Sequence, residues 1–217
     1  MNRKVIIGIA IAVLVIAGIA IGAWFLFREP GRAITADSLR FKEEYESRNN
    51  ELDEEGNHIY LPLSIDKRNN VVYLSYEELL FFIEYRTGLL FFGNSGSEWC
   101  RMLAPSLLNF AMEDNVTIYY YDIEGDREEN NDRYKKIISL LEEHLPTDTF
   151  SQSEGDPDFD PDLKILAVPH LFFFKIGEVK AEAMLYQHHY LSDNRADRVM
   201  QLLRDKFDTI ASDDCGC

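Results

Sequence analysis

The sequence predicts an α/β protein in which strands and helices alternate behind one apolar N-terminal segment. Three observations predict this class. Residues 5–27 contain no charged side chain. From Val71 onward, short apolar runs alternate with amphipathic segments, as they do in a parallel sheet connected by helices. Near the C-terminus, two apolar runs flank the turn residues Ile176 and Gly177, which is the pattern of a hairpin.

Composition limits the possible functions. A chain of 217 residues with 46% hydrophobic residues can build a packed core. The net charge of −16 argues against nucleic acid as a partner and disfavours anionic lipid head groups. Three cysteines are too few for a disulfide scaffold or a Cys₄ zinc site. The histidines and cysteines show no metal-ligand spacing, so we expect no metal and no other cofactor.

The apolar segment Val5–Phe27 is long enough to cross a membrane. At about 1.5 Å per residue, a helix over this segment spans roughly 35 Å. Arg3 and Lys4 precede it, and this basic flank predicts that residues 1–4 lie in the cytoplasm. We therefore expect a single-pass protein of the cell membrane, with its C-terminal domain outside the cytoplasm.

A cleaved signal peptide is the alternative interpretation of this segment. Against it, the apolar run is too long, and no clear small-x-small cleavage site follows it. Gly18 and Gly22 form a GxxxG pattern that would allow two anchors to pack as a homodimer, although small residues are common in such helices.

The remaining chain divides into three parts. Residues 28–70 are polar and charged, and we expect a stalk or an N-terminal cover with one short helix. A globular domain is expected over residues 71–211, followed by a short cysteine-containing tail over residues 212–217.

Each element of the domain follows from a local pattern. Ser75 and Glu78 form a capping box at a helix start, and a kink is expected at Pro105 inside a later helix. The expected elements are strand Val71–Leu74, helix Tyr76–Arg86, strand Leu89–Gly93, helix Glu98–Met112, strand Val116–Asp122, helix Asn131–Leu145, hairpin strands His170–Lys175 and Glu178–Leu185, and helix Asn194–Ala211.

Two motifs in this order carry a family resemblance. The stretch "CRMLAP" begins at Cys100, which lies five residues before Pro105, and "AVPHLFFFKIGEV" contains Pro169. Together they resemble the thioredoxin family, in which a second active-site cysteine precedes a kink proline and a cis-proline precedes the hairpin. More narrowly, the chain is similar to membrane-anchored bacterial thioredoxin-like proteins and to bacteriocin-transport accessory proteins. The resemblance covers about residues 71–211 and implies a thioredoxin-like βαβαβαββα fold.

The resemblance also implies that the active site is degenerate. Ser97 takes the slot of the first cysteine, and a serine hydroxyl forms no disulfide. Phe91 stands where the family has a buried acid. Dithiol exchange through one Cys-x-x-Cys motif is therefore not available to this chain. A competing alignment pairs Trp99 and Cys100 with the family's Trp-Cys, but it requires a deletion at the helix start.

The remaining site residues are assigned on the same basis. Cys100 is expected to be an inert, half-buried thiol, and the alternative is a reactive thiol whose pKa Glu98 raises and Arg101 lowers. The resemblance implies that Trp99, Val168 and His170 line the substrate-binding surface around Pro169. We expect His170 to lie at the surface, and the alternative is an inward ring that tunes the site.

The chain ends in a Cys-Gly-Cys sequence formed by Cys215 and Cys217. A polar tail has little structural use for two cysteines, so a redox or metal role and no role both remain open. We expect these two cysteines to pair with each other or with another molecule, and not with Cys100 of the same chain.

Three functions are compatible with these features. The first is a membrane-anchored thioredoxin-like protein that assists or binds envelope or secreted proteins. The second is an active thiol-disulfide oxidoreductase that uses Cys100 or the tail cysteines. The third is a structural module of a membrane complex. Its partners are therefore expected to be protein clients or the other subunits of such a complex.

Overall fold

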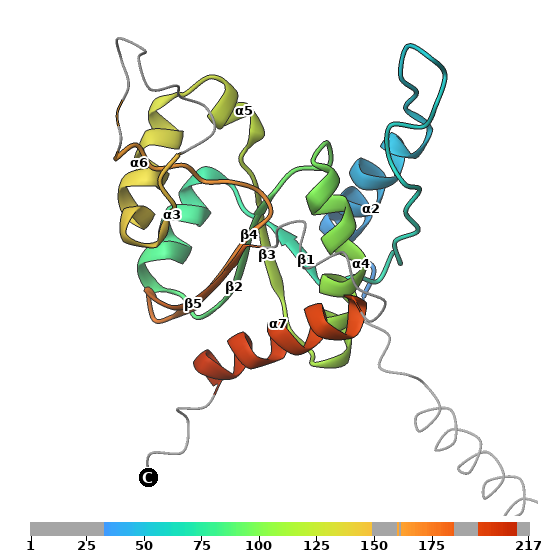
Figure 1. The fold of residues 1–217 in the computed structure, drawn as a ribbon. Coiled ribbons are helices and arrows are strands. Elements are labelled where there is room, and N and C mark those ends of the chain that lie inside the picture. Colours follow the sequence, from blue (N-terminus) through green and yellow to red (C-terminus); the bar gives the residue numbers. More distant parts are fainter. Residues whose placement is uncertain (1–32, 149–159, 161, 185–194, 212–217) are drawn as a thin grey trace, which may run out of the picture. The chain divides into compact units, whose positions relative to one another are not determined.

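The computed structural model describes residues 33–148, 160, 162–184 and 195–211 (Figure 1). Every helix and strand among them belongs to one of the two units into which the chain divides, Ile34–Cys217. The expected anchor, with Gly18 and Gly22, and the tail cysteines lie outside the described residues. Among the described residues, no helix is long and apolar enough to span a membrane.

The centre of the domain is a five-stranded mixed sheet with the strand order β1-β3-β2-β4-β5. β1, β3 and β2 are parallel, whereas β4 runs antiparallel to both β2 and β5. The α/β class and the hairpin at the sheet edge are therefore confirmed. The strands are β1 (Val71–Tyr73), β2 (Gly88–Gly93), β3 (Ile118–Asp122), β4 (His170–Lys175) and β5 (Glu178–Met184).

The helices follow the predicted order with one difference. They are α2 (Ala36–Ser47), α3 (Tyr76–Tyr85), α4 (Glu98–Glu113), α5 (Glu124–Glu128), α6 (Asp132–Leu141) and α7 (Arg195–Ala211), with 3₁₀ turns at Arg48–Asn50 and Glu142–His144. The expected capping box of Ser75 and Glu78 is present at α3. The prediction of a single helix between β3 and β4 is wrong, because a short additional helix, α5, precedes α6.

Two asparagines explain why α5 and α6 are separate. Asn130 has a φ of 44°, in the left-handed region that asparagine tolerates better than most residues. Asn131 then caps α6, since its side chain accepts a hydrogen bond of 3.0 Å from the Tyr134 N–H.

Helices cover both faces of the sheet (Figure 1). On one face, α2, α4 and α7 pack against Leu171 and Phe173 of β4 in one core cluster. On the other face, α3 and α6 pack against Phe172 and Phe174. Successive residues of β4 therefore point to opposite faces, as the pleat requires.

The cover segment, which we define as residues 34–70, packs against the domain. Phe41 and Tyr45 of α2 are fully buried in the same cluster as α4. The Phe41 ring stacks on Tyr45 at 4.2 Å and meets the Tyr120 ring edge-on at 5.3 Å. The described part of this segment therefore contributes side chains to the core of the domain.

Candidate functional site

The candidate site begins where β2 leaves the sheet and α4 starts. A short loop over residues 94–97 connects them, and Ser97 is the N-cap of α4. The Ser97 hydroxyl accepts a hydrogen bond of 3.3 Å from the Cys100 N–H. Ser97 is partly exposed, whereas Cys100 lies one turn deeper in the fold. Ser97 and Cys100, the two site residues predicted from the sequence, therefore lie at the start of one helix.

Cys100 is completely buried, and not half-buried as expected. Its Sγ lies so near Gly93 that a Cβ atom at that glycine would be 3.2 Å away. Burial raises the pKa of the Cys100 thiol to about 12, and hydrogen bonds from Ser97 and Asn94 offset this only in part. A thiol with this pKa forms almost no thiolate near neutral pH, so it is a poor nucleophile.

The charges near Cys100 differ from those expected. Neither Glu98 nor Arg101 sets the pKa of the thiol, and that expectation is wrong. Glu98 is exposed, and the Arg101 guanidinium binds elsewhere. The carboxylate of Asp122, at the end of β3, raises the pKa further. Sequence reasoning missed Asp122, although its position at the carboxyl end of a parallel strand beside β2 was a usable signal.

Buried polar groups surround the thiol. The hydroxyls of Tyr45 and Tyr120 and the side-chain oxygen of Asn94 have no aligned hydrogen-bond partner among the described residues. Burial raises the pKa of both tyrosines, and the charge of Cys100 adds to the shift at Tyr45. Both tyrosines remain protonated, so neither can act as a base for the thiol.

Arg101 fastens the cover segment to α4. Its guanidinium donates hydrogen bonds to the Tyr45 carbonyl, to Asn49 Oδ1 at 2.8 Å and to the Leu61 carbonyl at 3.3 Å. It also lies 4.8 Å from the centre of the Tyr60 ring. The side chain is almost fully buried, so its role is to hold three parts of the cover segment at the start of α4.

The cover segment also contacts the loop before Ser97. Arg48 Nε donates a hydrogen bond of 3.0 Å to Ser95 Oγ, and Tyr60 Oη donates one of 2.9 Å to the Gly96 carbonyl. A Cβ atom at Gly96 would be 3.3 Å from the Arg48 guanidinium carbon. The loop over residues 94–97 is therefore covered by residues that no local sequence pattern indicated, because they are distant in the chain.

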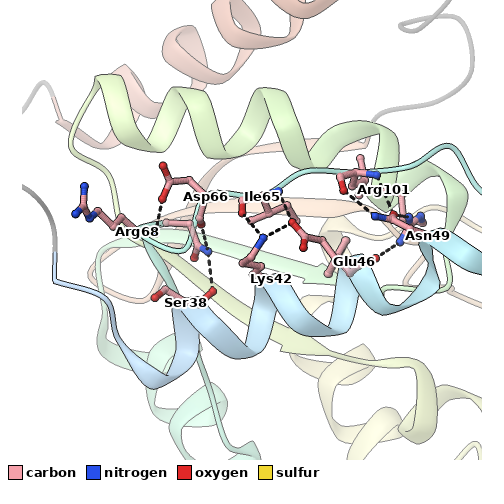
Figure 2. A network of polar contacts seen from close by, with 11 residues as sticks. Ser38, Lys42, Glu46, Asn49, Ile65, Asp66, Arg68 and Arg101 are labelled. Carbon is pink, nitrogen blue, oxygen red and sulfur yellow. Dashed lines mark hydrogen bonds and ion pairs between the residues drawn. The ribbon is translucent and has the colours of Figure 1, made fainter.

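Figure 2 shows how α2 holds the extended part of the cover segment. Residues along one side of the helix, and Asn49 in the 3₁₀ turn that follows it, bind main-chain groups of the returning chain. Lys42 Nζ donates to the Ile65 carbonyl at 2.9 Å, and Glu46 accepts from the Ile65 N–H at 2.7 Å. Asn49 exchanges two hydrogen bonds with the main chain of Leu63, at 2.7 and 2.8 Å. Ser38 binds the Lys67 carbonyl at 2.7 Å.

The loop before β4 has the geometry that the resemblance implies. The peptide bond between Val168 and Pro169 is cis, and Pro169 is buried. Val168 is partly buried and packs against both core clusters, and Trp99 packs against the cluster that contains Cys100. The binding roles of Trp99, Val168 and Pro169 remain predictions.

His170 is placed differently from the expectation. It is fully buried, so its interpretation as a surface residue is wrong. Its ring stacks on Phe172 at 4.1 Å, and Phe172 belongs to the cluster on the face opposite Cys100. His170 Nε2 lies 3.5 Å from Glu182 Oε2. Burial lowers the pKa of His170, so a neutral ring is favoured, and the ring does not face the thiol.

The site has a limited chemistry. Cys100 is free, and it is the one cysteine among the described residues. The described residues contain no group of three or more histidine, cysteine, aspartate or glutamate side chains that could hold a metal ion. The described site therefore offers one free, buried thiol.

Comparisons with protein-family models and with curated proteins find no match. Among solved structures, the chain is similar to thioredoxin O2 and thioredoxin O1 from Arabidopsis thaliana, both crystallised in the oxidized state. Each thioredoxin is 20% identical to this chain, and each match covers 64% of this chain. The matches cover 96% and 99% of the two thioredoxins, with TM-scores of 0.39 and 0.38.

Proposed function

We propose that this chain is a non-catalytic, thioredoxin-like module that binds other proteins. In this proposal, residues 5–27 anchor it in a bacterial membrane and the domain lies outside the cytoplasm, where it assists envelope or secreted proteins.

One observation carries the non-catalytic part of the proposal. The Cys100 thiol is completely buried, with a pKa raised to about 12. Thiol-disulfide exchange requires an accessible thiolate that attacks a disulfide sulfur. Ser97, the partly exposed residue at the helix start, supplies a hydroxyl instead. Neither residue of the Ser-x-x-Cys pair can therefore begin the exchange.

The cover segment supports the same conclusion. Arg48 and Tyr60 bind the loop before Ser97, and Arg101 holds Tyr45, Asn49 and Leu61 against α4. A site that must accept a disulfide substrate needs access at this loop. Here the loop is bonded to the chain's own residues Arg48 and Tyr60. These bonds support a non-catalytic role for the domain.

An insulin-reduction assay on the full chain in detergent tests this function. We expect no reduction above the dithiothreitol background, both for the wild type and for a Cys215→Ser/Cys217→Ser variant. Turnover by the wild type would overturn the proposal. If the tail variant then lost that turnover, the tail cysteines would be the active pair.

The proposed topology needs a separate experiment. Protease added to intact spheroplasts should remove the domain and leave a membrane-bound stub. Digestion only after lysis would place the domain in the cytoplasm and contradict this part of the proposal.

A further inference from the structure

Three large apolar side chains are exposed at one corner of the domain, which we call the apolar corner. Phe81 and Tyr85, one turn apart on α3, are 50% and 54% exposed, and their ring centres lie 5.2 Å apart. Ile176, in the turn between β4 and β5, is 76% exposed. Its N–H donates a hydrogen bond of 2.9 Å to Thr87 Oγ1, so the turn is fastened beside the end of α3 (Figure 1).

The folding of the domain does not explain the isoleucine in this turn. Ile176 has a φ of 50°, in the left-handed region where a β-branched residue is an outlier. Glycine or asparagine fits such a turn better. The side chain is also exposed to water, so it adds little to the core. An isoleucine is favourable here only if its side chain is buried against something outside the domain.

The apolar corner lies at the edge of the sheet where the parallel strands begin. Ile176 follows β4, and Phe174 of β4 pairs with Gly88, the first residue of β2. The first turn of α2 reaches the same edge, because the Ser38 carbonyl accepts a hydrogen bond of 2.8 Å from Asn69, just before β1. Three strand spacings separate β1 from β4, or about 14 Å. The cover segment therefore begins at the same edge as the apolar corner.

The length of chain before the cover segment limits how far this edge can move from a membrane. In the proposed function the anchor ends at Phe27, seven residues before Ile34. Seven extended residues span at most about 25 Å. A domain of about 150 residues has a diameter of about 40 Å. A tether shorter than the domain keeps the edge where the cover segment begins within reach of the bilayer.

The charge at this edge is compatible with lipid head groups. Residues 66–70, before β1, and residues 84–88, before β2, contain three bases and two acids, in a chain with a net charge of −16. None of the three bases forms an ion pair with another described residue. The bases are Lys67, Arg68 and Arg86, and the acids are Asp66 and Glu84. These bases can bind the phosphate groups of zwitterionic lipids.

We propose that the apolar corner docks on the surface of the membrane that the anchor crosses. Phe81, Tyr85 and Ile176 enter the boundary between head groups and acyl chains, where aromatic side chains are favoured. Arg86, whose guanidinium lies 5.3 Å from the centre of the Phe81 ring, binds a lipid phosphate. The inference rests on the proposed membrane anchoring and adds which face of the domain meets the bilayer. The opposite edge, with Ser97, then faces away from the lipid towards protein partners.

Nanodiscs of phosphatidylcholine that hold the full chain test the proposal. Ile176→Cys is made in a Cys215→Ser/Cys217→Ser background and labelled with a small fluorophore. The background protein, treated in the same way, measures any labelling of Cys100. Two quenchers then report the surroundings of the dye: a nitroxide on the lipid acyl chains and iodide in the water.

Leu61→Cys in the same background is the matched control. Leu61 is 71% exposed, and its carbonyl accepts from Arg101 near the start of α4, at the opposite edge of the sheet. We expect the lipid nitroxide to quench the dye at position 176 at least threefold more strongly than the dye at position 61, and iodide to show the reverse order. Adding Phe81→Ser and Tyr85→Ser should lower lipid quenching at position 176 to the level at position 61.

Equal lipid quenching at the two positions would overturn the proposal. Protection of the dye at position 176 from both quenchers would also overturn it, because the apolar corner would then be covered by protein and not by lipid. A chain that does not co-elute with the nanodiscs would contradict the anchoring itself, and the docking with it. The two failures are therefore distinguishable, since co-elution reports on the anchor and quenching reports on the apolar corner.

Discussion

The hydroxyl of Tyr60 donates a hydrogen bond of 2.9 Å to the carbonyl oxygen of Gly96, across 36 positions of sequence. This bond joins the cover segment to the loop that precedes Ser97 and Cys100. It is one of the contacts that cover the loop over residues 94–97, together with the hydrogen bond from Arg48 to Ser95.

Removing the Tyr60 hydroxyl should loosen the cover. Tyr60→Phe loses one partly buried hydrogen bond, so the free energy of unfolding should fall by about 1 kcal/mol. Urea unfolding measures this change. Tyr85→Phe is the matched control, because the Tyr85 hydroxyl donates to Glu84 on the exposed surface. It should leave stability unchanged, and an equal loss in both variants would contradict a specific role for Tyr60.

Arg101 should contribute more to the free energy of unfolding than a surface arginine does. Arg101→Met leaves the carbonyls of Tyr45 and Leu61 without their donor, so we expect a loss of about 3 kcal/mol in the free energy of unfolding. Arg204→Met is the control, because Arg204 pairs with Glu113 and Asp114 at the surface. The role assigned to Arg101 is wrong if the two variants have the same urea midpoint.

The buried thiol predicts a loss of stability in alkaline solution. The pKa of Cys100 is raised to about 12 in the folded protein, against about 8.5 for an unfolded thiol. Its contribution is therefore complete below about pH 8.5 and is lost as the pH rises towards 12. The slope is at most about 1.4 kcal/mol per pH unit.

Cys100→Ala should remove this slope. Urea unfolding of both proteins between about pH 8.5 and 9.5, below the pKa of about 10 of unfolded tyrosines, measures the difference. Parallel curves for wild type and variant across this window would show that the thiol ionises equally in both states.

The buried ring of His170 should make the protein less stable in mild acid. Burial lowers its pKa below the ordinary value of 6.5. The stability from the neutral ring is present above about pH 6.5 and is lost as the pH falls through the lowered folded pKa. His170→Phe keeps the stack on Phe172 and should flatten stability between pH 7 and 5. His58→Gln, at an exposed position, should retain the wild-type pH profile, and a flattened profile there would remove His170 as the cause.

Restoring the missing cysteine should produce a disulfide. Ser97 and Cys100 are three residues apart in the first turn of α4, where side chains at this spacing are neighbours. The Cα separation of such a pair suits a disulfide. Oxidised Ser97→Cys should lose both site thiols in mass mapping. Two free thiols after oxidation would show that the frame around Cys100 is not that of a Cys-x-x-Cys site.

Local patterns predicted most of the fold. The parallel strands appeared as short apolar runs, the capping box located α3, and Ile176-Gly177 marked the hairpin turn, where both residues have positive φ. The extra helix α5 was missed because its five residues are polar and carry no apolar periodicity. Its boundary depends on the conformation of Asn130, which the neighbouring residues do not specify.

The site was less predictable than the fold. The sequence indicated Ser97, Cys100 and Pro169 because each belongs to a local motif. It did not indicate Arg48 or Tyr60, because their contacts with residues 94–97 depend on how the cover segment folds back. The buried state of His170 was also missed. A histidine before an apolar run does not reveal which face of the sheet its ring occupies.

The reactivity of Cys100 in the native protein shows whether the thiol is closed off from solvent. Maleimide labelling of the Cys215→Ser/Cys217→Ser variant isolates this thiol, and the rate is measured from zero urea to the unfolding transition. We expect negligible labelling in the absence of urea and a rate that rises in step with the unfolded fraction. Rapid labelling in the absence of urea, at a rate that urea does not change, would show that Cys100 is accessible in the folded protein and would contradict its burial.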